Sequence, residues 1–261
     1  MHIGISTASF YPMETEKALR FLGEHGVATT EIFFNSPSEL SDSFLKQLAD
    51  IVAAHGMRVT SVHPFTSGME NYLFFSGYRR RFEDSLKLYE RYYKAAAMLG
   101  AKFVVLHGER SGNHLPREES YARFAQVAEC GRPYGVRLAH ENVYNHSGAD
   151  PAYLAGLRRF LHDDVSFVLD FKQARRAGVP LQEYTDAMGP CIRHLHLSDA
   201  DAEHDCIPPG KGTADYADIR RRLFAAGMSP ETDGVVELYA DGYGRYEELL
   251  EGCRTAASYF E

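Results

Sequence analysis

Acidic and histidine side chains recur in this chain directly after short apolar runs, in an order that predicts a metal site. Six such runs end in Val62-His63-Pro64, Leu106-His107-Gly108-Glu109, His140-Glu141-Asn142, Leu169-Asp170-Phe171, His194-Leu195-His196 and Val236-Glu237-Leu238. Carboxylates brought close together repel one another, and a bound divalent cation offsets that repulsion. Carboxylate oxygens combined with imidazole nitrogens suit Mn²⁺, Mg²⁺, Co²⁺ or Zn²⁺, and the lack of cysteine in the set argues against a structural zinc site.

The elements that must position these residues alternate regularly along the chain. Strands are expected at 2–6, 27–34, 58–63, 102–107, 136–141, 165–170, 192–197 and 234–238, and helices at 15–25, 39–55, 77–99, 117–134, 151–161, 181–188, 216–226 and 246–260. Eight strand–helix units predict parallel pairing and closure into a single (β/α)8 TIM barrel domain over 1–261. An open doubly wound sheet is the alternative, and the lack of a glycine-rich loop after the first strand disfavours it.

Active residues of such barrels stand at the C-terminal ends of the strands. One strand-end histidine or carboxylate alone is more often a helix cap or loop anchor, but six on adjacent strands favour a metal site. Glu141 is preferred over His140, and His196 over His194 on the interpretation that the two histidines point in opposite directions. The predicted metal ligands are therefore Glu141, Asp170, His196 and Glu237. The remaining histidines are expected on the surface or in loops: His2, His25, His55, His114, His146 and His162.

Composition narrows the class of protein. The net charge of −8 disfavours a nucleic-acid partner, because phosphate contacts need a basic surplus. No apolar run reaches the length of a membrane span, and the N-terminus shows no secretory pattern. Four widely spaced cysteines form no Cys-x-x-Cys pair, which favours free thiols and a cytoplasmic location. A homo-oligomer is compatible with the sequence.

Taken together, these motifs resemble the xylose isomerase-like barrel superfamily, which holds sugar isomerases and epimerases, inosose dehydratases and isomerases, and endonuclease IV. The resemblance spans nearly the whole chain and rests on Glu141, Asp170, His-Leu-His-Leu-Ser-Asp at 194–199, Pro-Gly-Lys-Gly at 209–212 and Val-Glu-Leu-Tyr at 236–239. The ketose 3-epimerase branch implies that Glu141, Asp170, His196 and Glu237 hold the metal, and that the two glutamates also move the proton.

The endonuclease IV branch implies further positions. Its two additional histidines map to His63 and His107, which implies a possible second metal. Its third zinc needs a histidine where Gln173 stands and another where Cys206 stands, so a three-zinc phosphodiesterase is incomplete here. Nearby basic residues are expected to meet a phosphate or carboxylate of a substrate or to form a solvated helix face, and the second option is favoured for the two arginines: Lys172, Arg175 and Arg176.

The leading functional hypothesis is a metal-dependent isomerase or epimerase that acts on a small ketose, sugar phosphate or keto-polyol through an enediolate. His63, His107 and Glu109 are expected to orient substrate hydroxyls, with Lys172 and Gln173 as further substrate contacts. The alternatives are a metal-dependent ketocyclitol dehydratase, an endonuclease IV-like phosphodiesterase and a non-catalytic sugar-binding module. The aromatic loop at 66–77 is expected to wall the pocket, contact another subunit or pack against the neighbouring helix.

Overall fold

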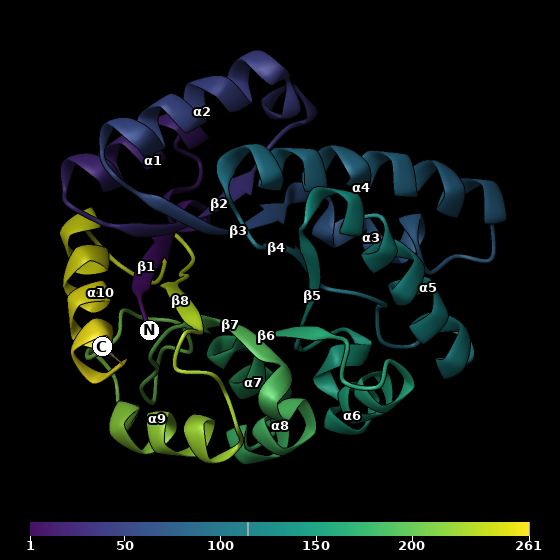
Figure 1. Ribbon diagram of the computed structural model, residues 1–261. Coiled ribbons are helices and arrows are strands. Elements are labelled where there is room, and N and C mark those ends of the chain that lie inside the picture. The colour runs from purple at the N-terminus through teal and green to yellow at the C-terminus, as the bar shows by residue number, and fades with distance from the viewer. Residues whose placement is uncertain (114, 261) are drawn as a thin grey trace.

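The computed structural model describes residues 1–113 and 115–260. Eight strands pair in parallel in chain order, and the last strand pairs with the first, so the sheet closes (Figure 1). The predicted (β/α)8 barrel is confirmed. The strands are β1 Ile3–Ser6, β2 Thr29–Phe34, β3 Arg58–Pro64, β4 Phe103–Leu106, β5 Arg137–Glu141, β6 Ser166–Asp170, β7 Ile192–Leu197 and β8 Asp233–Val236.

Helices surround the barrel on its outside (Figure 1). They are α1 Thr15–Glu24, α2 Asp42–Ala54, α3 Glu70–Leu73, α4 Arg79–Leu99, α5 Arg117–Glu129, α6 Pro151–Phe160, α7 Phe171–Ala177, α8 Leu181–Met188, α9 Tyr216–Ala225 and α10 Tyr246–Phe260. The sequence does not predict α3, which is too short for a helical repeat of apolar residues, and it indicates α7 only as a helix face around Lys172, Arg175 and Arg176. Among the described residues, no helix is both long and apolar enough to cross a membrane.

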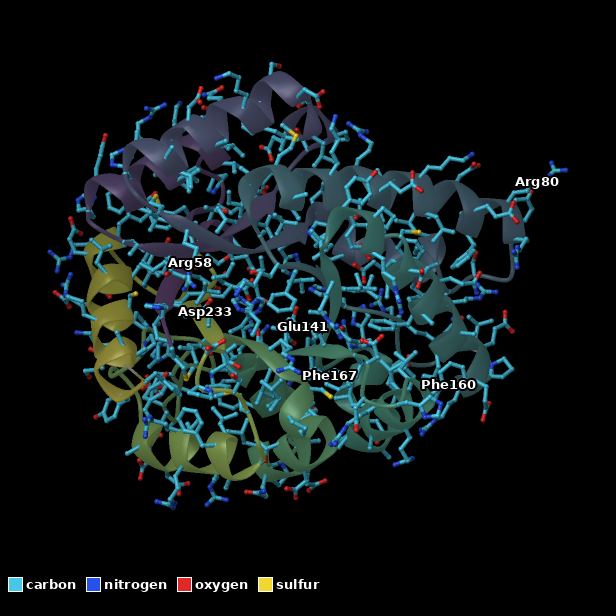
Figure 2. All side chains as sticks on the ribbon, in the orientation of Figure 1. Arg58, Arg80, Glu141, Phe160, Phe167 and Asp233 are labelled. Carbon is cyan, nitrogen blue, oxygen red and sulfur yellow. The ribbon has the colours of Figure 1, made fainter. Side chains whose placement is uncertain are left out.

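Residues alternate along each strand between the barrel interior and the helix-facing side. On β5 the His140 ring packs outward, 5.6 Å from the ring of Phe124 and 5.8 Å from that of Tyr153. Its neighbour Glu141 points the other way, toward the middle of the barrel (Figure 2). Choosing Glu141 over His140 from the sequence therefore agrees with the observed directions. The buried His140 side chain is part of the packing under α5 and α6.

Gly108 lies two residues after the end of β4, at the C-terminal rim of the barrel. It has φ +86°, and an added Cβ would lie 2.4 Å from Nε2 of the outward-facing His140. Only glycine combines this backbone conformation with such a close approach. The Gly108 amide also donates to Glu70 Oε2 at 2.8 Å. This tight passage fixes the positions of His107 and Glu109 on either side of it.

The aromatic loop after β3 packs against a helix, which is one of the three roles left open above. The buried Phe74 ring meets that of Tyr89 on α4 edge-on at 4.6 Å and that of Phe82 at 6.2 Å. Met69 and Tyr72 of the same loop are 45% and 63% exposed. The loop is therefore anchored through Phe74 and presents two large side chains to solvent.

Candidate metal centre

The four predicted ligands come together at the C-terminal ends of β5 to β8. Glu141, Asp170 and His196 lie on β5, β6 and β7, and Glu237 directly follows β8. Each offers one ligand atom, and the four atoms lie within 4.8 Å of one another. His196 Nδ1 lies 3.3 Å from Glu237 Oε2, 3.6 Å from Asp170 Oδ2 and 3.8 Å from Glu141 Oε1. One cation can therefore reach all four side chains.

Two of these ligand atoms, and the other oxygen of Glu141, support a metal site because they are buried and make no hydrogen bond to the described residues apart from ion-pair contacts. Glu141 Oε2, Asp170 Oδ2 and His196 Nδ1 are buried and have no hydrogen-bond partner within residues 1–113 and 115–260. A buried polar group left unsatisfied costs about 1–3 kcal/mol. Separations near 3.3 Å suit ligands that each lie about 2.1 Å from one ion. The donor set of carboxylate oxygens and one imidazole nitrogen fits a divalent cation.

A buried lysine stands beside this group. Lys172 is the second residue of α7, and its Nζ lies 2.9 Å from Glu237 Oε2 and 3.2 Å from Asp170 Oδ2. The same ammonium lies 4.6 Å from the centre of the Tyr239 ring. Burial alone would lower the pKa of Lys172, but the carboxylates of Asp170 and Glu237 hold it well above its usual value. Lys172 is thus directed at two candidate ligands.

The carboxylates of the centre provide the negative charge that a divalent cation needs. Asp170 and Glu237 pair with Lys172, and with Glu141 they face the space between the ligand atoms. Burial raises the pKa of Glu141, but His107, His196 and His63 together bring it well below its usual range. Burial likewise raises the pKa of Glu237, and Lys172 and His196 outweigh that effect. Both glutamates are therefore carboxylates.

His63 and His107 form a second group with Glu141. Their Nε2 atoms lie 3.2 Å apart, and Glu141 Oε2 lies 3.3 Å from His107 and 3.6 Å from His63. Burial lowers the pKa of His63, but its contact with Glu141 and the nearby Glu31 raise that pKa to about 9. The triangle of two nitrogens and one oxygen also has the separations of a ligand set. Glu141 is shared by both groups.

Two other predicted site residues lie outside both ligand groups. Glu109 is buried, and its Oε1 accepts a hydrogen bond from Asn113 Nδ2 at 2.7 Å. Gln173 Oε1 accepts from the Tyr144 amide at 3.2 Å, and the Gln173 amide donates to Asp170 Oδ1 at 2.8 Å. Gln173 therefore fixes the Asp170 carboxylate through the helix cap.

The arginines that follow are not a solvated helix face, so that prediction is wrong. Arg175 is half-buried and donates to Ser198 Oγ at 2.6 Å and to the Asp205 carbonyl. Arg176 pairs with the Asp205 carboxylate. Both fasten the segment after β7 to α7, because that segment folds back over the helix instead of leaving it open to water.

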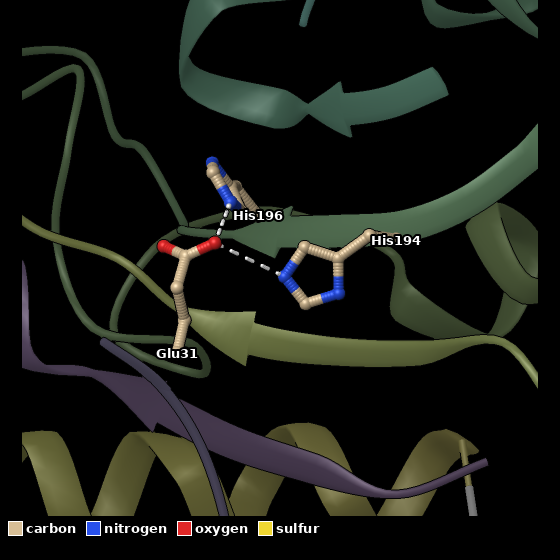
Figure 3. A group of neighbouring side chains, drawn as sticks. All are labelled: Glu31, His194 and His196. Atoms are coloured by element: carbon tan, nitrogen blue, oxygen red, sulfur yellow. Dashed lines mark hydrogen bonds and ion pairs between the residues drawn. The ribbon is translucent and has the colours of Figure 1, made fainter. Parts of the chain in front are cut away.

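The prediction that His194 and His196 point in opposite directions is also wrong. Residues two apart on a strand share a face. Both side chains point inward, and their Nε2 atoms lie 3.5 and 3.2 Å from Oε2 of Glu31 (Figure 3). Glu31 was missed by the sequence analysis. The available signal was a lone acidic residue inside the otherwise uncharged strand Thr29–Phe34.

One of the six histidines expected on the surface or in loops is buried in a loop. The His146 ring is 8% exposed and lies 5.6 Å from that of His107. Burial lowers the pKa of His146 to about 3, so it is a neutral neighbour of the centre. His114, another of that set, lies outside the described residues.

Comparisons with known proteins agree with this fold. Residues 19–254 match the sequence profile of the xylose isomerase-like TIM barrel family. An uncharacterized protein of Mycobacterium tuberculosis is 25% identical over 249 residues, which cover 87% of this chain and 85% of that protein. The crystal structure of D-psicose 3-epimerase in the presence of D-fructose superposes with a TM-score of 0.79 at 14% identity, covering 99% of this chain and 97% of that one. The IolI protein with a bound zinc atom gives 0.74 at 20%, covering 99% and 96%. The chain belongs to the xylose isomerase-like TIM barrel family.

Proposed function

We propose that this protein is a metal-dependent isomerase or epimerase that acts on a small ketose, sugar phosphate or keto-polyol. The observation that carries the proposal is the pair Glu141 and Glu237, two carboxylates that join Asp170 and His196 in one ligand group. A protein that only binds a sugar does not need two ionised glutamates that can accept a proton. Membership of this family, and the fold shared with D-psicose 3-epimerase, support the same class of substrate.

The proposed division of labour follows from where the side chains stand. Glu141, Asp170, His196 and Glu237 would hold a divalent cation, which would supply Lewis-acid polarisation of a substrate carbonyl and its neighbouring hydroxyl and so acidify the adjacent C–H. Glu141 and Glu237 come from strands three positions apart around the barrel, so they approach a bound substrate from different sides. One glutamate removes the proton and the other returns one, with an enediolate of the substrate between the two steps. Each such step contributes about 10²–10⁴-fold.

The histidine side of the centre is proposed to orient the substrate. His107 is 19% exposed, more than any ligand in the carboxylate group, and it lies next to the buried His63. Glu109 follows on the same segment. These side chains would hold substrate hydroxyls or, with Glu141, a second cation. Counting metal ions per chain by elemental analysis distinguishes these two roles.

The test is exchange of a substrate C–H proton with solvent deuterium, measured by NMR over a panel of ketoses and inososes. We expect exchange with the wild-type protein, and exchange at least about 100-fold slower with Glu141→Gln or with Glu237→Gln. Glu39→Gln is the matched control, because Glu39 is a half-buried carboxylate at the same end of the barrel and outside both ligand groups. Metal content is measured for every variant.

Exchange at the wild-type rate in both glutamine variants would contradict the proposed mechanism. A product lighter by one water would instead identify a dehydratase that uses the same glutamates.

A further inference from the structure

A buried carboxylate lies behind the candidate centre, on the side of His196 that faces away from the other ligands. Glu31 on β2 has no exposed surface. Its Oε1 accepts from Ser6 Oγ at 3.0 Å, and its Oε2 accepts from Ser61 Oγ at 2.7 Å. Oε2 also lies 3.2 Å from His196 Nε2 (Figure 3). The His196 ring is therefore held between Glu31 and the ligand group.

The chemistry of these contacts fixes which ring nitrogen carries the proton. Both Glu31 oxygens accept hydrogen bonds from serine hydroxyls, and Oε2 also faces ring nitrogens of His194 and His196, so Glu31 acts as a carboxylate that only accepts. His196 Nε2 must then be the donor in the contact with Glu31. In a neutral ring this leaves the lone pair on Nδ1, and Nδ1 is the atom that faces Glu141, Asp170 and Glu237.

We propose that Glu31 is the positioning residue of the metal centre: it selects the His196 tautomer with the proton on Nε2 and holds the ring so that Nδ1 is the metal ligand. A histidine that ligates a metal commonly donates its other ring N–H to a carboxylate, which orients the ring and makes it a stronger ligand. The inference rests on the metal centre of the proposed function and adds a fifth protein residue to it. Glu31 belongs to neither of the two ligand groups described above, and with His194 and His196 it forms a third group whose ligand atoms lie within 4.8 Å of one another.

His194 provides the matched comparison for Glu31. It lies two residues before His196 on the same face of β7, and its Nε2 is 3.5 Å from the same Glu31 oxygen. Its Nδ1 faces the Asp233 carbonyl at 3.1 Å, on the side away from the ligand group. His194 thus shares the buried contact with Glu31 and meets the His196 ring edge-on at 5.2 Å, but its own nitrogens do not face Glu141, Asp170 or Glu237.

The first test measures Zn²⁺ and Mn²⁺ affinity of the metal-stripped full-length protein by competition with a chelator. A carboxylate that accepts a hydrogen bond from a metal-ligating histidine contributes about 10–100-fold to metal affinity, so we expect Glu31→Gln to bind each ion about 10–100-fold more weakly. We expect His194→Gln to stay within about threefold of wild type. Equal affinity of wild type and Glu31→Gln would overturn the inference. If His194→Gln bound one ion fewer than wild type, the inference would also be overturned, because Glu31 would then itself be a metal ligand together with His194.

The second test needs no variant and so does not depend on whether Glu31→Gln folds. Nitrogen-15 NMR of histidine-labelled wild-type protein reports the protonated ring atom of His196 before and after addition of Zn²⁺. We expect zinc on Nδ1 and the remaining ring proton on Nε2 in the zinc-bound protein. Zinc on Nε2, with the proton on Nδ1, would overturn the inference. Failure of wild type to bind any divalent ion would contradict the proposed metal centre, whereas zinc on Nε2 would contradict only the role of Glu31.

Discussion

The side of the candidate centre built by β5 to β8 carries three carboxylates, one histidine and a buried lysine, whereas the side built by β3 and β4 brings two histidines into a group whose carboxylate is Glu141 of β5. The buried Glu70, which acts on His107, uses its oxygens for other donors. Its Oε2 accepts from the Gly108 amide at 2.8 Å, and its Oε1 accepts from the Tyr89 hydroxyl at 2.6 Å. The carboxylate in direct contact with both histidines is therefore Glu141.

This difference predicts which of the two sides binds a divalent cation more tightly. A divalent ion gains most of its binding energy from anionic ligands, and three of these converge on the β5–β8 side. The β3–β4 side offers neutral nitrogens and shares one oxygen of Glu141. The first ion should therefore enter the carboxylate side, and the histidine side should bind a substrate hydroxyl or a weaker second ion. Changes on the two sides should have separable effects.

The largest expected effect comes from Asp170→Asn. Asparagine can still accept the Gln173 amide at the start of α7, because Oδ1 alone makes that cap. Oδ2 is replaced by an NH₂ group that faces both the cation space and the Lys172 ammonium. A hydrogen-bond donor can neither ligate the cation nor accept a hydrogen bond from the ammonium. We expect Mn²⁺ affinity to fall by more than about 100-fold, measured by calorimetry on metal-stripped protein.

The control for this change is His107→Gln, on the other side of the centre, which should leave binding of the first ion within about threefold. If His107→Gln weakened binding of the first ion as much as Asp170→Asn does, the two sides would act as one site. The predicted difference in affinity between the sides would then be wrong.

Much of this centre could be predicted from the sequence, because the end of a barrel strand is visible as the end of an apolar run. Asp170 follows three apolar residues and Glu237 follows a glycine and two valines, and the closed topology then places them on one rim. His107 follows four apolar residues, whereas the run before His63 is mixed with Thr and Ser. Predicting their separation into two groups requires side-chain directions and the exact register of each strand, which local patterns do not contain.

The contacts of Glu31 and Lys172 could not be predicted from the sequence. Glu31 is 165 positions from His196, so their contact exists only after β2 and β7 have both joined the barrel. For Lys172, which follows a strand end, the sequence predicts a substrate contact or a place on a helix face, and it does not show that the turn from β6 into α7 buries the side chain. That turn is what directs its ammonium back to Asp170 and Glu237. Both residues are explained by tertiary contacts alone.

Glu70 allows the histidine side to be tested through stability. Burial raises the pKa of Glu70 to about 7, although His107 and the Tyr89 hydroxyl lower it in part. A folded-state pKa above the unfolded value of about 4.5 means that the folded protein binds the extra proton. Stability from this group is thus present below about pH 4.5 and lost as the pH rises through 7. We expect Glu70→Gln to gain on the order of 2–3 kcal/mol in free energy of unfolding, relative to wild type, between pH 5 and pH 8.

Urea unfolding of the metal-free proteins at both pH values measures this difference. Glu83→Gln, an exposed position on α4, is the control and should show no such change. A constant difference between wild type and Glu70→Gln at the two pH values would mean that Glu70 is ionised throughout, and that the histidine side has a carboxylate of its own.

The smallest of the three effects concerns Lys172, which separates the carboxylate side from an ordinary cluster of acids. Its ammonium repels an incoming dication and competes with it for Asp170 and Glu237. Lys172→Met keeps the buried stem and removes the charge, so we expect Mn²⁺ affinity to rise about tenfold in calorimetry, a change of about 1.4 kcal/mol. Lys102→Met, which changes an exposed lysine at the opposite end of the barrel, should leave the affinity unchanged. Weaker binding by Lys172→Met would show that the ammonium serves chiefly to hold the two carboxylates in place as ligands, and that positioning outweighs repulsion on this side of the centre.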